Sequence, residues 1–329
     1  MSKISICIPT YKRPDLLKVA VDSCLAQSFQ DFEIVISDDS PDTRTEEMVR
    51  NISSKQRVRY IHNLPGMGQA RNVNQLFSAA TSEFLVLLHD DNFLMPSALD
   101  DLLKPLEQNP MVVASFGKDY LAANDGVILY AESELTNQRY SKTDDRADRV
   151  QRSAWSVLAA QFPPDGYMVR TAAANKTLYR DDPEVGEACD RDFAYRLAEL
   201  GDFFFVGKYL HAYRITEESI SSKGLRILLS KLYFMLQRRT VPNDLEGFRR
   251  DRLRDLAPVA VNGCLLMADR ANALKILIGP NYPWRRNFVK GAIQVALAFA
   301  PRGLTEMTIR QNSERKVKAG FAGGLYSAS

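Results

Sequence analysis

The chain has 329 residues, of which 45% are hydrophobic and 25% charged, as in a folded globular protein. Its net charge of +3 is too small to indicate nucleic acid as the main partner. Only three histidines occur, which disfavours a histidine-rich zinc site. The four cysteines are widely spaced and form no CxxC pair, which indicates reduced, structural thiols in a cytosolic protein.

The hydrophobic stretches are too short for a signal peptide or a membrane span. Ile4–Ile8 is preceded by a single lysine, and no cleavage site follows it. The longest apolar stretch near the other end, Ala292–Ala300, has about half the length that crosses a bilayer. The protein is therefore expected to fold in the cytoplasm.

Apolar runs alternate with amphipathic segments over residues 1–90. The apolar runs predict strands at Ile4–Ile8, Phe32–Ser37, Arg57–His62 and Phe84–His89. Helical spacing of apolar residues predicts helices at Leu16–Leu25, Thr43–Ile52 and Gly68–Ala80. Continuously apolar strands separated by helices favour an α/β, Rossmann-like fold, with helices flanking a mostly parallel sheet.

The pattern is mixed beyond residue 110. Strands are predicted at Val112–Gly117, Gly126–Tyr130, Phe203–Val206 and Tyr209–Arg214, and a helix at Asp190–Leu200. The polar segment Glu132–Arg152 indicates a loop or an exposed helix with a solvated face. From Leu225 onward the pattern is mostly helical.

Polar residues follow the predicted strands of the first half. Right-handed crossovers place the carboxyl ends of parallel strands along one edge of the sheet, where ligands bind. The segments that leave the strands at this edge are Pro9–Arg13, Asp38–Ser40, His62-Asn63 and His89–Asn92. Acidic side chains are therefore expected to gather at a ligand site.

Asp90 and Asp91 are the first candidate metal ligands. Two adjacent carboxylates at a strand end repel each other and raise each other's pKa, which a hard divalent cation relieves. The alternative is that one of them caps the helix predicted near Pro96. Spacing alone leaves both interpretations open.

Asp38-Asp39 ends the second strand. A carboxylate at this place can accept hydrogen bonds from a ribose or a base, although, taken alone, an Asx turn with Ser40-Pro41 explains the pair better. Gly66-Met67-Gly68 is not a dinucleotide-binding fingerprint, because Arg71 stands where the third glycine would be.

Carboxylates also precede the helix predicted at Asp190–Leu200. Glu187, Asp190 and Asp192 are each either helix caps or a general base. Arg214, after Tyr213, is either a phosphate ligand or one partner of a surface ion pair.

Taken in order, these motifs resemble a known family. They are Pro9-x-Tyr11-x-Arg13, Asp38-Asp39, Asn63…Gly66…Ala70-Arg71-Asn72, Leu88-His89-Asp90-Asp91-Asn92, Asp190-x-Asp192 and Tyr213-Arg214. Over residues 2–220 the set resembles the inverting family 2 glycosyltransferases with the GT-A fold.

The resemblance implies a role for each matching residue. It implies that the nucleotide sugar is bound by Pro9, Tyr11, Arg13, Asp39, Arg71, Asp90 and Arg214. Asp91 matches the last, metal-binding aspartate of the family's DxD motif, and Asp190 matches the catalytic base. Two positions depart from the pattern: His89 replaces the first aspartate of DxD, and Cys189 replaces the glutamate before the base.

The implied activity is inverting, metal-dependent transfer of a sugar from a nucleoside-diphosphate sugar, with UDP favoured, to an acceptor hydroxyl. The resemblance implies Mn²⁺ or Mg²⁺ as the cofactor and a saccharide or lipid-linked saccharide as the acceptor, in the synthesis of bacterial surface polysaccharides or glycoconjugates. The expected domains are a catalytic domain at 1–220, with a nucleotide-sugar half at 1–110 and an acceptor half at 111–220, and a helical region at 221–329.

Three other classes compete with this activity. A nucleotidyltransferase would carry a glycine-rich phosphate loop after the first strand, whereas Pro9–Arg13 contains no glycine. An inactive sugar-nucleotide-binding protein is disfavoured by the presence of Asp91 and Asp190. An RNA-binding module would carry a concentrated basic face, which the balanced charge does not favour.

The last hundred residues combine aromatic, basic and apolar side chains. Tyr282–Arg286 precedes the apolar helical segment Phe288–Ala300. Basic residues follow at Arg302, Arg310, Arg315, Lys316 and Lys318. Such helices either pack on the catalytic domain or a second subunit, or contact the headgroups of an anionic membrane. The resulting hypothesis is reversible attachment to the cytoplasmic face of the membrane.

Overall fold

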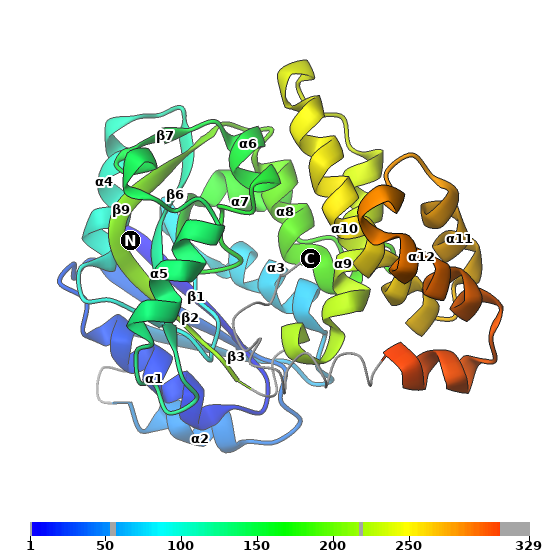
Figure 1. The fold of residues 1–329 in the computed structure, drawn as a ribbon. Coiled ribbons are helices and arrows are strands. Elements are labelled where there is room, and N and C mark those ends of the chain that lie inside the picture. Colours follow the sequence, from blue (N-terminus) through cyan, green and yellow to red (C-terminus); the bar gives the residue numbers. More distant parts are fainter. Residues whose placement is uncertain (1, 53–56, 217–219, 310–329) are drawn as a thin grey trace. The chain divides into compact units, whose positions relative to one another are not determined.

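A computed structural model describes residues 2–52, 57–216 and 220–309 (Figure 1). The basic positions Arg310, Arg315, Lys316 and Lys318 lie outside the described residues. The chain divides into two compact units. We call them the sheet unit (Met1–Asp181 with Cys189–Thr216) and the helical unit (Asp182–Ala188 with Glu217–Ser329).

The sheet unit begins with four parallel strands in the order β3-β2-β1-β4. The strands are β1 (Ile4–Thr10), β2 (Phe32–Asp38), β3 (Val58–His62) and β4 (Phe84–Leu87). Helices α1 (Pro14–Leu25), α2 (Arg44–Arg50) and α3 (Gln69–Ala79) connect them. The register pairs Thr10 with Asp38, so the polar segments after β1 and β2 start side by side.

Beyond β4 the sheet is mixed. Its further strands are β5 (Phe93–Leu94), β6 (Val112–Ala122), β7 (Arg149–Gln151), β8 (Tyr167–Arg170) and β9 (Asp202–Arg214). β8 runs antiparallel to both β4 and β6, and β9 is parallel to β6 but antiparallel to β5 and β7. The expectation of an α/β sheet flanked by helices is confirmed, but only the first half of the sheet is entirely parallel.

Helices cover both faces of the sheet (Figure 1). Ile4, Ile6 and Ile8 share one buried cluster with side chains of α1 and α4 (Ala98–Gln108), whereas the Cys7 thiol donates to the Leu76 carbonyl oxygen of α3 at 3.7 Å. Alternation along β1 therefore sends its side chains to two apolar layers. The remaining helices of the unit are α5 (Tyr130–Arg139), α6 (Ser153–Leu158), α7 (Thr171–Thr177) and α8 (Cys189–Leu197), with a 3₁₀ turn at Asp144–Arg146.

Three predicted strands differ from the structure. Gly126–Tyr130 is a turn that leads into α5: Gly126 has a φ of 89°, and only Ile128 forms a bridge, with Ala122. The segments predicted as separate strands at Phe203–Val206 and Tyr209–Arg214 are one strand, β9. Irregular register opposite β6 lets β9 continue through this region, which a sequence pattern of period two does not reveal.

The helical unit consists of α9 (Ile220–Arg238), α10 (Glu246–Leu266), α11 (Arg270–Ile278) and α12 (Trp284–Phe299), with 3₁₀ turns at Gly186–Ala188 and Asn243–Leu245. A Cβ at Gly263 would lie 2.2 Å from the Arg226 carbonyl oxygen, so glycine allows α9 and α10 to approach closely. No helix in the described part of the chain is both long enough and apolar enough to cross a bilayer.

Candidate functional site

Thr10 joins the two acidic segments at the carboxyl edge of the parallel strands. Its hydroxyl donates to Asp90 Oδ2 at 2.7 Å, and its carbonyl oxygen accepts from the backbone N–H of Asp39 at 3.0 Å. The side chain is 3% exposed, which protects both bonds from water. The Asp38-Asp39 and Asp90-Asp91 motifs therefore lie next to each other at one edge of the sheet.

Arg13, Asp90 and Asp91 form a compact group that we call the carboxylate cluster. Arg13, immediately before α1, places one guanidinium nitrogen 2.8 Å from Asp91 Oδ2 and 3.6 Å from Asp90 Oδ1. Burial and the negative charge of Asp91 raise the pKa of Asp90 to about 6, against the opposing effect of Arg13. One arginine thus incompletely compensates two neighbouring carboxylates.

The carboxylate cluster could supply one or two ligands to a divalent cation whose remaining ligands are diphosphate oxygens and water. The described residues hold no group of three or more histidine, cysteine or acidic side chains that would enclose a metal. Mg²⁺ in phosphate-binding sites is commonly held by one or two carboxylates, with phosphates and water completing the shell. The raised pKa of Asp90 shows that additional positive charge would be favourable there.

Asp39 follows β2 and contacts the loop that leads into α3. Its two carboxylate oxygens accept from Asn63 Nδ2 at 2.9 Å and from the backbone N–H of Gly68 at 2.8 Å. A Cβ at Gly66 would approach the Asp39 carbonyl oxygen to 2.7 Å, so the loop passes close to the backbone of Asp39. Asp39 therefore orders the loop before α3, and each oxygen keeps lone-pair capacity for a ligand.

Pro9, Tyr11 and Arg71, the other predicted nucleotide-binding residues, lie in three different environments. Pro9 lies within β1, paired with Ser37, and Tyr11 projects into solvent with 54% of its surface exposed. Arg71, in the first turn of α3, is exposed and forms an ion pair with Asp181 at 2.5 Å. Among the described residues, no hydrogen bond or ion pair joins Arg71 to the carboxylate cluster.

Arg214 holds in place the loop that carries Asp90 and Asp91. Its guanidinium donates to the backbone oxygens of Asp91 at 2.9 Å and Asn124 at 2.8 Å, and the backbone N–H of Arg214 donates to Asn92 Oδ1 at 2.9 Å. The side chain is buried at the end of β9. Arg214 therefore contributes positive charge next to Asp90-Asp91 and holds the backbone of Asp91.

Asp165, which the sequence analysis did not single out, secures the same loop from a position just before β8. It is fully buried, and its Oδ2 accepts from the backbone N–H of His89 and from Asn92 Nδ2, both at 2.9 Å. Asn92 is thereby held between Asp165 and Arg214. The positions of Asp90 and Asp91 thus depend on two side chains that come from distant parts of the chain.

A buried chain of charges extends from Asp165. His211 of β9 lies with Nε2 3.3 Å from Asp165 Oδ2 and Nδ1 3.0 Å from Asp119 Oδ1, and Asp119 also pairs with Lys142. Burial alone lowers the pKa of His211, but the carboxylates of Asp165 and Asp119 raise it to about 9. Burial would raise the pKa of Asp165, but the His89 and His211 charges and the His211 and Asn92 hydrogen bonds hold it well below its usual range.

The segment Glu132–Arg152 was expected to be a loop or an exposed helix. Most of α5 and the short strand β7 lie in it, so the strand was not predicted; most of its residues are exposed, but Lys142 is only 3% exposed. A buried ammonium is tolerated here because Asp119 supplies the opposite charge.

We expect the free energy of unfolding to depend on whether His211 is protonated. Because its pKa is raised on folding, protonation stabilises the protein fully below about pH 6.5, and this contribution of about 3 kcal/mol disappears as the pH rises through 9. Urea unfolding at pH values across this range measures the loss. Imidazole NMR should show one of the three histidines titrating near pH 9, and titration of all three below pH 7 would contradict this assignment.

Asp190, the predicted base, lies in the first turn of α8 and is partly exposed. Its Oδ1 accepts from the N–H of Arg191 at 2.7 Å. Burial raises the pKa of Tyr167 well above its ordinary value, and the charges of Asp165 and Asp190 raise it further. Asp190 therefore belongs to the electrostatic surroundings of the same buried region, although no described hydrogen bond joins it to the carboxylate cluster.

Asp192, two residues further along α8, is engaged elsewhere. It is 1% exposed and pairs with Arg196 at 2.7 Å and Arg180 at 3.6 Å. These contacts make Asp192 a structural carboxylate.

Comparison with known proteins relates the first half of the chain to glycosyltransferases. Residues 5–154 match the family model described as Glycosyl transferase family 2. The GalNAc(5)-diNAcBac-PP-undecaprenol beta-1,3-glucosyltransferase of Campylobacter jejuni is 35% identical over 106 residues, which are 32% of this chain and 34% of that protein. An uncharacterized glycosyltransferase of Methanocaldococcus jannaschii is 24% identical over 70% of this chain and 76% of its own length.

Solved structures share the fold over almost the whole chain. S. aureus TarS in complex with UDP-GlcNAc matches with a TM-score of 0.62 and 15% identity, over 94% of this chain and 92% of that one. The Pyrobaculum calidifontis mannosyltransferase PcManGT in complex with GDP-Man and Mn²⁺ matches with a TM-score of 0.57 and 15% identity, over 90% and 86%. Residues 5–154, a little less than half of the chain, therefore match glycosyl transferase family 2, and the chain has the fold of the GT-A glycosyltransferases.

Proposed function

We propose that the protein transfers a sugar from a nucleoside-diphosphate sugar, with UDP favoured, to an acceptor hydroxyl with inversion at the anomeric carbon. The observation that carries this proposal is the junction at Thr10, which brings Asp39 and the carboxylate cluster to one strand edge. The family match and a structural neighbour bound to UDP-GlcNAc support it. The donor half is proposed at 1–110 and the acceptor half at 111–220, with residues 221–329 as a helical region.

The proposed donor site places the nucleoside near Asp39 and the diphosphate near the carboxylate cluster. Pro9 and Tyr11 line the nucleoside side, and Arg13, Arg71 and Arg214 add positive charge around the diphosphate. Asp91, with Asp90 beside it, would hold Mn²⁺ or Mg²⁺, which supplies charge neutralisation for the departing diphosphate. A neighbour of the same fold is recorded with GDP-Man and Mn²⁺, which supports this cofactor class.

Proton transfer is assigned to Asp190. In an inverting displacement the acceptor oxygen attacks opposite the leaving diphosphate and loses its proton to a single base, so no covalent enzyme intermediate forms. The first turn of α8 leaves the Asp190 carboxylate partly open to solvent, where an acceptor can reach it. The deeply buried Asp165 instead holds the loop of the carboxylate cluster in place.

The acceptor is proposed to be a saccharide or lipid-linked saccharide in the synthesis of bacterial surface glycans. The Campylobacter jejuni relative carries an undecaprenol-linked saccharide in its name, which supports a lipid-linked acceptor. Such an acceptor would place the protein at the cytoplasmic face of the membrane, through peripheral contact. Pairing of two copies through the C-terminal helices is the competing proposal.

Nucleotide titration tests the donor site. UDP and GDP are titrated calorimetrically with and without Mn²⁺, and the tighter ligand is then compared in wild type and Asp39→Asn. The substitution should weaken nucleotide binding about tenfold, because an amide donor replaces one acceptor of a charged hydrogen-bonding group. Asp42→Asn is the matched control, because Asp42 is an exposed carboxylate three residues further along, paired with Arg44. Equal affinities of all three proteins would remove Asp39 from the site.

A further inference from the structure

Helix α12 carries an uninterrupted apolar stripe on its exposed side. The stripe follows helical spacing and consists of Phe288, Val289, Ala292, Ile293, Ala296 and Phe299. Its largest members have 69% (Phe288), 71% (Val289) and 71% (Phe299) of their surface exposed. A soluble helix normally presents polar side chains on such a face, and a continuous apolar face marks an interaction site.

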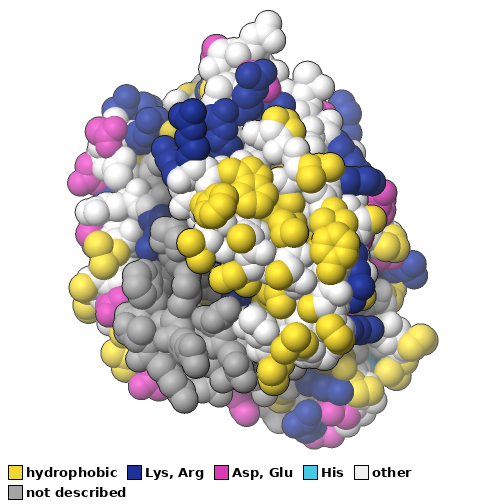
Figure 2. Space-filling view, turned by 45° about the vertical axis from the view of Figure 1, so that its right-hand side comes forward, with side chains coloured by type: hydrophobic (Ala, Val, Ile, Leu, Met, Phe, Trp, Pro, Cys, Tyr) yellow, Lys and Arg dark blue, Asp and Glu magenta, His cyan; other side chains and the backbone are white. Residues whose placement is uncertain are grey.

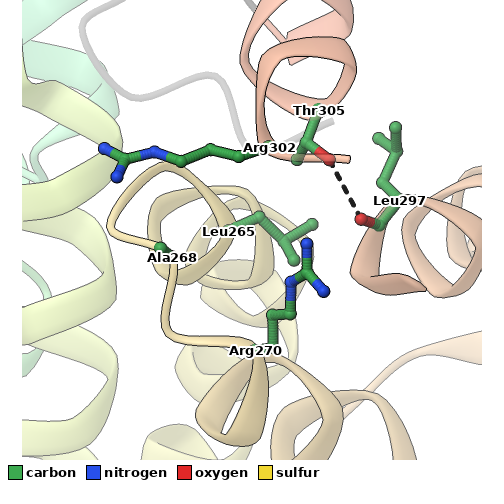
Figure 3. Close-up of a pocket in the computed structure, with 6 residues that line it drawn as sticks. All are labelled: Leu265, Ala268, Arg270, Leu297, Arg302 and Thr305. Atoms are coloured by element: carbon green, nitrogen blue, oxygen red, sulfur yellow. Dashed lines mark hydrogen bonds between the residues drawn. The ribbon is translucent and has the colours of Figure 1, made fainter. Parts of the chain in front are cut away.

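The opposite side of α12 is firmly packed, so the stripe is a fixed surface. Gln294 is buried and donates to the Pro258 carbonyl oxygen of α10 at 2.6 Å while it accepts from the Tyr282 hydroxyl at 2.7 Å. Figure 3 shows a small pocket at the end of α12, where the Thr305 hydroxyl donates to the Leu297 carbonyl oxygen at 3.1 Å. Arg270, which also lines this pocket, donates to the Ala300 carbonyl oxygen at 2.6 Å.

The region around the stripe is strongly basic. Residues 270–305 contain no aspartate or glutamate and six cations: Arg270, Lys275, Arg285, Arg286, Lys290 and Arg302, of which Arg302 is paired with Glu306 at 2.7 Å. Arg285 and Arg286 are exposed at the start of α12, immediately before the stripe. Figure 2 shows a broad hydrophobic area on the face brought forward in that view, with lysine and arginine side chains along its upper edge.

We propose that α12 lies in the headgroup region of an anionic lipid bilayer, with Phe288, Ile293 and Phe299 inserted among the acyl chains. Arg285 and Arg286 then contact lipid phosphates. Charge decides between this partner and a second copy of the chain, because a symmetric contact through the stripe would bring identical basic clusters together. An anionic surface instead complements both the apolar stripe and its cations.

This proposal identifies α12 as the surface that would make the peripheral membrane contact suggested under the proposed function. Membrane binding through α12 does not require sugar transfer. Vesicle binding and transferase activity can therefore fail independently. Co-sedimentation of the full chain is measured with phosphatidylcholine vesicles and with vesicles that also contain phosphatidylglycerol. We expect binding to the anionic vesicles only, and weaker binding at high salt, because counterions screen the arginines.

Two pairs of variants separate the apolar and charged contributions. Phe288→Ser with Phe299→Ser should lower vesicle partitioning at least about tenfold, because two exposed aromatic rings no longer enter the bilayer. Arg285→Gln with Arg286→Gln should lower it about tenfold on anionic vesicles. All four side chains are exposed, so thermal unfolding should match that of the wild type.

The matched controls lie in the sheet unit. Met111→Ser with Val127→Ser removes two side chains that are 71% and 60% exposed, and Lys18→Gln with Arg50→Gln removes two exposed cations from α1 and α2. Both controls should bind vesicles like the wild type. Equal loss in controls and stripe variants, or no binding of the wild type to anionic vesicles at low salt, would overturn the proposal. Sedimentation equilibrium adds a further outcome: a dimer that the phenylalanine variant dissociates, without vesicle binding, would make the stripe a subunit interface.

Discussion

Asp190→Asn is expected to lower the rate of sugar transfer about 10²- to 10⁴-fold and to leave UDP affinity unchanged. The amide has the shape of the carboxylate but cannot take the proton of the acceptor hydroxyl, and a positioned general base typically accelerates a reaction by this factor. Asp190 has a carboxylate oxygen bonded to the N–H of Arg191, a contact that the amide oxygen of asparagine can keep. The measurement is single-turnover transfer with saturating donor, together with the dissociation constant of UDP.

The matched control for this prediction is Glu187→Gln. Glu187 is an exposed carboxylate three residues before Asp190, and the same chemical change there should leave turnover intact. Asp192 is a poorer alternative base, because Arg196 and Arg180 already hold it in a buried ion pair. Wild-type turnover of Asp190→Asn would show that another group accepts the proton and would remove Asp190 from this role.

Asp91→Asn is expected to abolish the dependence of donor binding on Mn²⁺ and to lower turnover about 10²- to 10³-fold, the usual effect of removing one charge-stabilising contact from a transition state. The substituted amide would retain a neutral oxygen but not the charge that a hard cation requires. The fold should persist, because the backbone oxygen of this residue, rather than its side chain, anchors Arg214.

UDP titration with Mn²⁺ and with EDTA distinguishes the contribution of the metal to binding affinity from that of the nucleotide. The wild type should bind more tightly with Mn²⁺, and the variant should bind equally under both conditions. Asp22→Asn is the control, since Asp22 is an exposed carboxylate on α1 paired with Lys18. A variant that retains the full Mn²⁺ effect would place the metal on other ligands.

The sequence by itself identified the parallel half of the sheet and the residues at its edge. The runs at Ile4–Ile8 and Phe32–Ser37 are mostly apolar because both faces of β1 and β2 are largely buried, and that property is visible without a structure. The carboxylates that follow such strands must meet at one edge. Asp39, Asp90 and Asp91 therefore could be placed together from the pattern alone.

Only the tertiary structure revealed the side chains that hold this edge in place. Asp165 lies 76 residues from His89 in the chain, and His211 lies 92 residues from Asp119. Charged residues in a sequence are normally interpreted as solvated, and a buried charge becomes acceptable only when a partner arrives through the fold. Local periodicity reports which face of a strand is apolar, but the pairing of buried charges depends on contacts between distant segments, so it can be read only after the chain has folded.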